Sequence, residues 1–212
     1  PVQLKENETM RQLILTSFAA FALVMPFFAA NAAAPEIGQA APDFEATDIE
    51  GNPFKLSDHK GEIVVLEWTN AQCPFVVKHY GSGNMQKVQK EATEKGVKWI
   101  TINSSAEGRQ GYVSDEEAAK ILEEKGAAPT AKILDPSGEI GKLYDAKTTP
   151  HMFVIDAEGN VAYAGAIDSN SSANPDTIEG AENYVTAAID SLKAGEAVET
   201  TTTSPYGCAV KY

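Results

Sequence analysis

The stretch Ile63-Val-Val-Leu-Glu-Trp-Thr-Asn-Ala-Gln-Cys-Pro-Phe-Val-Val-Lys78 places a cysteine between an apolar run and a segment that begins with proline. The run 63–68 is short, almost wholly apolar and rich in β-branched residues, which is typical of a strand buried on both faces of a sheet. Beyond Pro74, apolar residues recur at helical spacing up to a glycine stop (Met85, Val88, Ala92, Gly96). The sequence therefore predicts a strand, then Cys73, then a helix that runs to Lys95.

Cys73 is predicted to be the reactive residue of the protein. At the start of a helix, its sulfur lies near free backbone N–H groups and the positive end of the helix dipole, both of which stabilise a thiolate. A cysteine whose pKa is lowered in this way is nucleophilic and active in redox chemistry. The alternative for Cys73 is an inert cysteine of the core.

The rest of the pattern indicates one α/β domain. Asp48–Asn52 forms a turn between two short extended segments, so a hairpin is expected there. The capping sequence Ser114-Asp-Glu-Glu117 begins a second helix. Further strands are predicted at 97–102, 132–135, 151–156 and 161–164, a short helix at 137–144 and a terminal helix at 175–194.

A set of short segments in the first half of the domain carries a family resemblance: Gly38–Phe44, Asp48–Asn52, Leu56, Gly61–Leu66 and Cys73-Pro74. Together they resemble the redoxin branch of the thioredoxin superfamily, the alkyl-hydroperoxide-reductase/thiol-antioxidant branch, over residues 36 to 168. The resemblance implies a thioredoxin fold, in which helices flank a central mixed β-sheet, with an N-terminal β-hairpin extension.

Further segments are most similar to a peroxiredoxin-like group with a single active-site cysteine: Asn70–Val76, Tyr144–Ala146, Thr149-Pro150 and Val161–Asp168. Val76 stands where a thioredoxin has the second cysteine of its C-x-x-C motif, so Cys73 lacks the usual short-range partner. Leu66 and Asn70 stand where true peroxiredoxins have the proline and threonine of their motif. These departures do not favour peroxidase activity.

The resemblance also implies roles for residues around Cys73. Glu67 matches the buried carboxylate of thioredoxins, which exchanges protons during attack on a disulfide. Thr149-Pro150 matches the superfamily's cis-proline, which packs beside the sulfur and presents the preceding backbone to a substrate chain. Asn70 and Pro74 complete the predicted site. A partnered structural carboxylate and an ordinary trans proline are the alternatives.

Cys208 is the candidate resolving cysteine. It lies in 197–212, a polar, threonine-rich stretch that is expected to be a flexible tail. If the tail folds back, the Cys208 thiolate attacks an oxidised or mixed-disulfide form of Cys73. The alternatives are pairing between chains and a free thiol.

Arg109 lies in a glycine-containing loop, and we expect it to be solvated rather than close to the thiolate.

The N-terminal part is typical of a targeting segment. Residues 10–34 contain a basic start, an apolar middle and the small residues Ala30-Asn-Ala-Ala-Ala34, the pattern of a cleaved secretory signal. A retained membrane anchor is the alternative. Residues 1–9 precede the first methionine and are interpreted as a misassigned start or a cloning remnant. The expectation is a periplasmic or secreted domain over 35–196, in a compartment where disulfides persist.

The composition excludes several function classes. The chain has 212 residues and a formal net charge of −13, which disfavours nucleic acid as a partner. No cofactor or metal is predicted. The predicted function is that of an exported thiol oxidoreductase, which acts on a disulfide-bearing protein or a peroxide and takes electrons from a thiol donor. The alternative is a non-catalytic thioredoxin-like module that binds a protein partner or copper, with His79 and His151 near Cys73.

Overall fold

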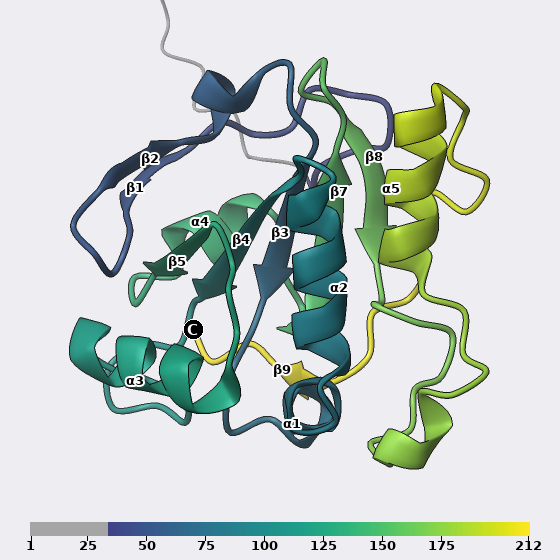
Figure 1. Cartoon of the computed structure of the whole chain (residues 1–212). Coiled ribbons are helices and arrows are strands. Elements are labelled where there is room, and N and C mark those ends of the chain that lie inside the picture. The colour runs from purple at the N-terminus through teal and green to yellow at the C-terminus, as the bar shows by residue number, and fades with distance from the viewer. Residues whose placement is uncertain (1–33) are drawn as a thin grey trace, which may run out of the picture. The chain divides into compact units, whose positions relative to one another are not determined.

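A mixed five-stranded sheet forms the centre of the computed structural model, which describes residues 34–212 (Figure 1). Its strands are β3 (Val64–Trp68), β4 (Lys98–Asn103), β5 (Ala131–Leu134), β7 (His151–Ile155) and β8 (Val161–Gly165). They lie in the order β5-β4-β3-β7-β8, so that β3 is central. β3 is parallel to β4 and antiparallel to β7, which makes the sheet mixed.

The central strand β3 is buried along its whole length, as predicted. Leu66 and Trp68 pack into an apolar cluster on one face of the sheet, and Val65 packs with Trp99 into a cluster on the other face. Because side chains alternate along a strand, Glu67 points to the same face as Val65. A carboxylate therefore lies inside the apolar core.

Helices cover both faces of the sheet. They are α1 (Pro74–Gly81), α2 (Asn84–Glu94), α3 (Asp115–Lys125), α4 (Glu139–Leu143) and α5 (Tyr184–Ala194), with short 3-10 turns at Leu56–His59 and Pro175–Thr177. Residues of α2 and α5 join the cluster that contains Val65, and residues of α4 join the opposite cluster. Figure 1 shows α2 and α5 in front of the sheet and α4 behind it.

The N-terminal extension is a hairpin of β1 (Glu45–Thr47) and β2 (Pro53–Lys55), which form their own antiparallel pair. Asp48 closes the turn because its carboxylate accepts hydrogen bonds from the backbone N–H groups of Glu50 and Asn52, at 2.9 and 2.8 Å. The hairpin, the mixed sheet and the flanking helices confirm the expected thioredoxin fold with an N-terminal β-hairpin extension.

The helix that follows Cys73 is divided in two. The sequence predicts a single helix to Lys95, whereas α1 ends at Gly81 and α2 begins at Asn84. Gly83 lies between them with a φ of 79°, a left-handed conformation that side chains with a Cβ rarely adopt. The helical hydrogen bonds are interrupted at this glycine, and the chain changes direction there.

The C-terminal segment is ordered, so the expectation of a flexible tail over 197–212 is wrong. Its strand β9 (Cys208–Ala209) pairs antiparallel with β6 (Thr148–Thr149), and Thr149 lies opposite Cys208. Further along the tail, the Tyr212 hydroxyl donates to the Ala146 carbonyl at 2.8 Å. The polar composition suggested solvation, but the threonine, tyrosine and backbone groups hydrogen-bond the domain instead.

The predicted signal segment 10–34 lies outside the described residues apart from Ala34, as does the stretch 1–9. Within residues 34–212, no helix is long and apolar enough to cross a membrane. The domain boundaries 35–196 remain predictions. The ordered tail belongs to the same compact unit as the sheet, which extends to Tyr212.

Gly207 generates a first prediction, because a Cβ there would lie 2.0 Å from the Thr149 carbonyl oxygen. We expect Gly207→Ala to detach β9 from β6 and to lower amide hydrogen-exchange protection at 208–209 by roughly tenfold or more, with the core strands still protected. Gly180→Ala is the matched control, since Gly180 also has a positive φ but has open space around it. Unchanged protection at 208–209 would contradict the close approach.

Candidate active site

Cys73 lies at the junction of β3 and α1. It is the N-cap residue of α1, and Pro74 is the first helical residue. Its side chain is 1% exposed. The thiol donates a hydrogen bond to the Thr149 carbonyl at 3.0 Å. The structure thus places the sulfur at the helix N-terminus, as the sequence predicts, but the side chain is buried rather than exposed to solvent.

The second cysteine lies directly beside the first. Cys208 lies near enough to Cys73 for the two thiols to shift each other's pKa, and both residues are free thiols. Burial opposes a Cys73 thiolate, but interactions with the Cys208 thiol, the Thr149 side chain and the Val76 backbone outweigh burial, so the pKa of Cys73 lies below its ordinary value. Burial, together with the interaction with the Cys73 thiol and the charge of Cys73, raises the pKa of Cys208 to about 11. Of the two thiols, Cys73 therefore loses its proton more readily, and Cys208 keeps its proton to higher pH.

The Thr149-Pro150 peptide bond is cis, in agreement with the sequence interpretation. Thr149 is buried and contacts the active-site sulfur through its carbonyl. This segment reaches Cys73 because β7, which follows it, pairs with β3 in a register that sets His151 opposite Trp68. The tail covers the same turn from the other side through the pairing of Thr149 with Cys208.

Asn70 shapes the turn that carries Cys73. Its side-chain oxygen accepts from the Gln72 N–H at 2.9 Å, and its side-chain nitrogen donates to the Gln110 carbonyl at 3.1 Å. Gly111 leaves room for this side chain, because a Cβ there would lie 2.2 Å from the Asn70 nitrogen. Asn70 therefore supports the site without contacting the sulfur through its side chain. Arg109, in the same loop as Gly111, is exposed.

Glu67 is fully buried and accepts three hydrogen bonds. The donors are the Tyr80 hydroxyl at 2.8 Å, the Gln89 amide at 3.2 Å and the Trp99 indole at 2.8 Å. Desolvation raises the pKa of Glu67 although these donors lower it. Within the described residues, neither carboxylate oxygen hydrogen-bonds the Cys73 thiol. Glu67 is thus a buried, hydrogen-bonded group of the core that binds its proton more tightly than an ordinary glutamate does.

Lys132 is a neighbour of Glu67 that the sequence analysis missed. It lies on β5, and burial lowers its pKa to about 8 although the Glu67 charge raises it. A lysine inside a predicted strand was the available signal, since such a residue is costly to bury without a role. Glu67 and Lys132 are electrostatically coupled, so protonation of one depends on the other.

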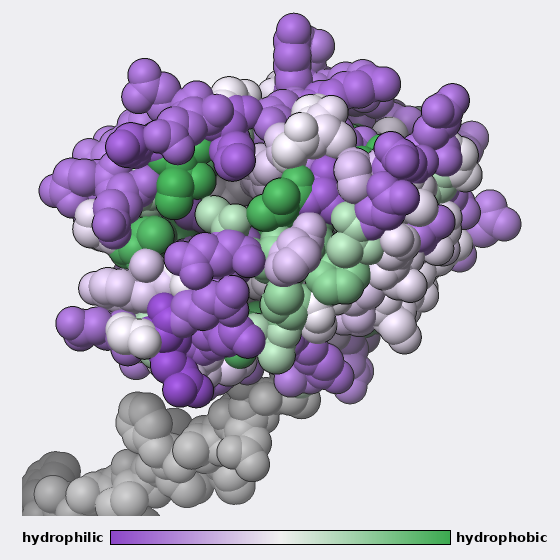
Figure 2. Space-filling view, turned by 90° about the horizontal axis from the view of Figure 1, so that it is seen from below, coloured by the Kyte–Doolittle hydropathy of each residue, from purple (hydrophilic) through white to green (hydrophobic). Residues whose placement is uncertain are grey.

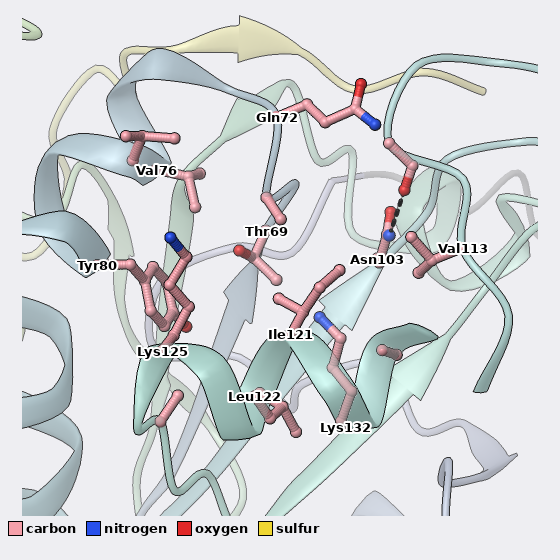
Figure 3. Close-up of a pocket in the computed structure, with 15 residues that line it drawn as sticks. Thr69, Gln72, Val76, Tyr80, Asn103, Val113, Ile121, Leu122, Lys125 and Lys132 are labelled. Carbon is pink, nitrogen blue, oxygen red and sulfur yellow. Dashed lines mark hydrogen bonds between the residues drawn. The ribbon is translucent and has the colours of Figure 1, made fainter. Parts of the chain in front are cut away.

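A cavity of about 60 Å³ lies between α1, α3 and the loop before α3. In the close-up, Thr69, Tyr80 and Lys132 line this cavity together with the apolar residues Ile121 and Leu122 (Figure 3). The same view shows the hydrogen bond from Asn103 to the Gly111 carbonyl, which is 2.8 Å long and holds the loop.

Figure 2 shows apolar side chains gathered in the middle of the molecular face seen from below, with polar side chains around them.

A buried polar cluster joins α1 to the tail, and the sequence did not predict it as a unit. The Lys78 ammonium lies 3.5 Å from Asp168. The Tyr206 hydroxyl hydrogen-bonds Asp168, and it also bonds His79 Nε2 at 3.1 Å. Burial lowers the pKa of His79 to about 4 despite the Asp168 charge, so this imidazole is neutral at neutral pH.

The histidines considered for metal binding have other partners. His79 belongs to the cluster with Tyr206, and His151 Nδ1 accepts a hydrogen bond from the Lys147 N–H at 3.3 Å. Burial also lowers the pKa of His151 to about 4. In residues 34–212, no group of three or more His, Cys, Asp or Glu side chains is arranged to hold a metal ion.

Curated proteins of related sequence are thiol-disulfide oxidoreductases by name. The chain is 30% identical over 149 residues to the thiol-disulfide oxidoreductase ResA of Bacillus cereus, covering 70% of this chain and 80% of that protein. It is 25% identical over 148 residues to the ResA of Geobacillus kaustophilus, covering 65% of this chain and 84% of that protein.

Solved structures of related proteins share the fold. An uncharacterised conserved protein from Geobacillus kaustophilus matches with a TM-score of 0.73 and 28% identity, over 84% of this chain and 92% of that one. A putative thiol:disulfide interchange protein DsbE from Chlorobium tepidum matches with a TM-score of 0.55 and 26% identity, over 74% of this chain and 99% of that one.

The sequence profile of the AhpC/TSA family matches residues 37–164, which contain β1 to β7, Cys73 and the cis-proline turn, together with most of β8. Cys208 and the tail lie beyond the matched region. With this profile, the relatives and the thioredoxin-like neighbours in agreement, the chain belongs to the AhpC/TSA family, the redoxin branch of the thioredoxin superfamily.

Proposed function

We propose that this protein is an exported thiol–disulfide oxidoreductase in which Cys73 is the nucleophile and Cys208 is the resolving cysteine. One observation carries the proposal: two free thiols meet at Thr149, which is paired with Cys208 and contacts the Cys73 sulfur, and they differ in acidity. Unequal acidity is what a two-step exchange needs, because one sulfur must attack while the other keeps its proton. The names of the curated relatives support the same reaction class.

The exchange proceeds in two displacements. The Cys73 thiolate attacks one sulfur of a substrate disulfide, a mixed disulfide forms, and the other substrate sulfur leaves as a thiolate that takes up a proton. Cys208 then loses its proton and attacks the Cys73 sulfur, which closes the Cys73–Cys208 disulfide and releases the second substrate thiol. An external dithiol donor reduces this disulfide by the reverse sequence and restores both thiols.

Peroxide reduction is a second candidate reaction of the same pair of cysteines. The burial of Cys73 favours it, because a small oxidant reaches a buried thiol more easily than a large one does. The thiolate attacks one peroxide oxygen, the O–O bond breaks, and a sulfenic acid forms as hydroxide or alkoxide leaves. Cys208 then displaces the sulfenic oxygen as water and closes the same disulfide. Exposed Arg109 contributes no contact to this step, so exchange is the better supported activity.

The other site residues hold this geometry. We assign Thr149 and Pro150 to the face on which the reacting sulfur of the substrate lies, since Thr149 contacts the thiol. Pro74 begins α1 and keeps the helix N-terminus directed at the sulfur. Asn70 holds the preceding turn. Glu67 exchanges the proton that the sulfurs gain and lose, through the buried network that includes Tyr80 on α1.

The cysteine pair leads to a test by mass spectrometry. A substoichiometric pulse of hydroxyethyl disulfide is expected to produce an intrachain Cys73–Cys208 bond in the wild type and a trapped mixed disulfide on Cys73 in Cys208→Ser. Cys73→Ser is the control, in which burial still opposes a Cys208 thiolate, so Cys208 should react with the disulfide far more slowly than Cys73 does in the wild type. A first modification on Cys208, or a dimer linked between chains, would contradict the assigned order.

Copper uptake that requires Cys73, without any exchange, would favour the non-catalytic alternative.

Glu67 gives a second test, in which rate and stability are both measured. We expect Glu67→Gln to slow exchange by on the order of tenfold or more, with Cys73 still alkylated by iodoacetamide. The folded-state pKa of Glu67 is raised, so the stability that its neutral form provides is present at low pH and is lost as pH rises above the ordinary value of 4.5. The variant should therefore gain stability over the wild type with increasing pH.

Glu91→Gln, an exposed change on α2, serves as the control for both Glu67 measurements. An unchanged exchange rate in Glu67→Gln would remove Glu67 from the mechanism and leave it a structural group. A stability difference that is constant from pH 4 to pH 8 would contradict the raised pKa.

Export rests on the pattern of residues 10–34 and is testable separately from catalysis. Expression from Met10 in a bacterial host should yield a periplasmic protein that begins at Ala33 or Pro35, as determined by intact mass. Deletion of 10–34 should leave the same domain in the cytoplasm. A mature protein that retains 10–32 would contradict cleavage and favour a membrane anchor.

A further inference from the structure

The chain's own tail occupies the strand edge beside the active-site sulfur. β9 pairs antiparallel with β6, and Cys208 lies opposite Thr149, whose carbonyl accepts the hydrogen bond from Cys73. Figure 1 shows β9 beside α1, at the end of the sheet where β3 terminates. A polypeptide that approached Cys73 in an extended conformation would need the same backbone groups of β6.

The tail lies too close to this turn for a second backbone to fit between them. A Cβ on Gly207 would come within 2.0 Å of the Thr149 oxygen and 3.3 Å of the Pro150 nitrogen. Beneath this contact, Cys73 is 1% exposed, whereas Cys208 remains partly exposed. A polypeptide that paired with β6 would therefore have to displace the backbone of the tail.

Tyr206 fastens the tail to α1 just before Gly207. Its hydroxyl bonds both Asp168 and His79. Its ring centroid lies 5.8 Å from that of Phe75 and 5.5 Å from the Lys78 nitrogen. Both helix residues belong to the first turns of α1, directly after Cys73. The position of the tail is therefore set against the same helix that carries the nucleophile.

Buried polar groups next to Tyr206 stabilise the attachment of the tail to α1. Asp168 is 3% exposed and lies 3.5 Å from the buried Lys78 ammonium. A buried carboxylate needs hydrogen-bond donors, and hydrogen bonds to charged groups stabilise more than neutral ones do. The Tyr206 hydroxyl is such a donor, and when the tail lifts, Asp168 loses it. Lifting the tail thus disrupts a buried ionic cluster as well as a pair of short strands.

A second anchor holds the tail upstream. The Thr203 hydroxyl bonds the Tyr163 hydroxyl at 2.5 Å and accepts from the Ala166 N–H at 2.9 Å. A Cβ on the neighbouring Gly165 would lie 2.2 Å from the Thr203 hydroxyl oxygen. Residues 203–209 are thus attached through Thr203 and Tyr206, and they reach the turn beside the sulfur at Gly207 and Cys208. We call this segment the strap.

We propose that the strap determines the substrate class of Cys73: small disulfides and hydroperoxides reach the thiol, whereas disulfides within polypeptides are excluded until the strap lifts. Tyr206 is the positioning residue that keeps the strap closed. The inference rests on the proposed function, because it names the substrates of the same nucleophile. The chemical steps are unchanged, with Cys73 attacking and Cys208 resolving.

The test compares the rates at which Cys73 is oxidised by a small and a polypeptide disulfide. Hydroxyethyl disulfide and hydrogen peroxide are the small probes, and insulin is the polypeptide probe. Tyr206→Phe keeps the ring against Phe75 and Lys78 but removes the hydroxyl. We expect it to raise the rate with insulin by roughly tenfold or more, the effect of losing a hydrogen bond to a buried charge, and to change the rates with the small probes far less.

Tyr212→Phe is the matched control, since the Tyr212 hydroxyl bonds the Ala146 carbonyl outside the strap. It should leave the ratio of insulin rate to small-disulfide rate at its wild-type value. Thr203→Val loosens the other attachment of the strap and should raise the ratio in the same direction as Tyr206→Phe. This second variant decides the question if Tyr206→Phe does not fold, which thermal unfolding reveals.

Two outcomes overturn the strap alone: a wild type that insulin oxidises as fast as hydroxyethyl disulfide does, or strap variants that leave the ratio unchanged. In both, Cys73 is reactive and the proposed function stands. A Cys73 that reacts with no probe in any variant overturns the proposed function itself, and the substrate inference with it.

Discussion

The antiparallel register between β3 and β7 is the constraint on which the site depends. It sets Trp68 opposite His151, and so brings the end of β3 next to the turn before β7. Cys73 follows β3 and Thr149 precedes β7, which is why the thiol reaches the Thr149 carbonyl across 76 positions of sequence. A shift of one residue would turn each apolar side chain of this buried strand to the opposite face. The apolar core therefore holds the catalytic geometry in place.

The surroundings of the two cysteines shift their pKa values in opposite directions. Interactions of Cys73 with the Cys208 thiol, the Thr149 side chain and the start of α1 outweigh the cost of burial and lower its pKa. Cys208 gains no comparable set of donors, and the charge of its partner further disfavours its own thiolate. In the proposed function this pair takes the place of the usual C-x-x-C arrangement, with the second cysteine on a strand at the end of the chain rather than on the next helical turn.

Buried titratable side chains recur around this pair. Glu67 and Lys132 lie behind α1, while Asp168 and Lys78 lie between α1 and the tail. Buried ionic groups are stabilising only when donors and opposite charges surround them, so each group requires its neighbours to be in place. The result is that α1, the sheet and the tail are held by polar contacts whose geometry is specific, in addition to apolar packing.

The sequence alone determined the strand–cysteine–helix unit, the hairpin, the capping box and the cis-proline turn. The first three follow from local patterns and the cis-proline from the family resemblance, and the structure contains each of them. The break at Gly83, the order of the tail and the cluster of Tyr206 with Asp168 were decided by the tertiary structure. Hydrogen bonds between residues far apart in sequence leave no periodic signal, and a threonine-rich segment has the same composition whether water or the domain satisfies its hydroxyls. Only the folded chain shows that Cys208 lies against Cys73.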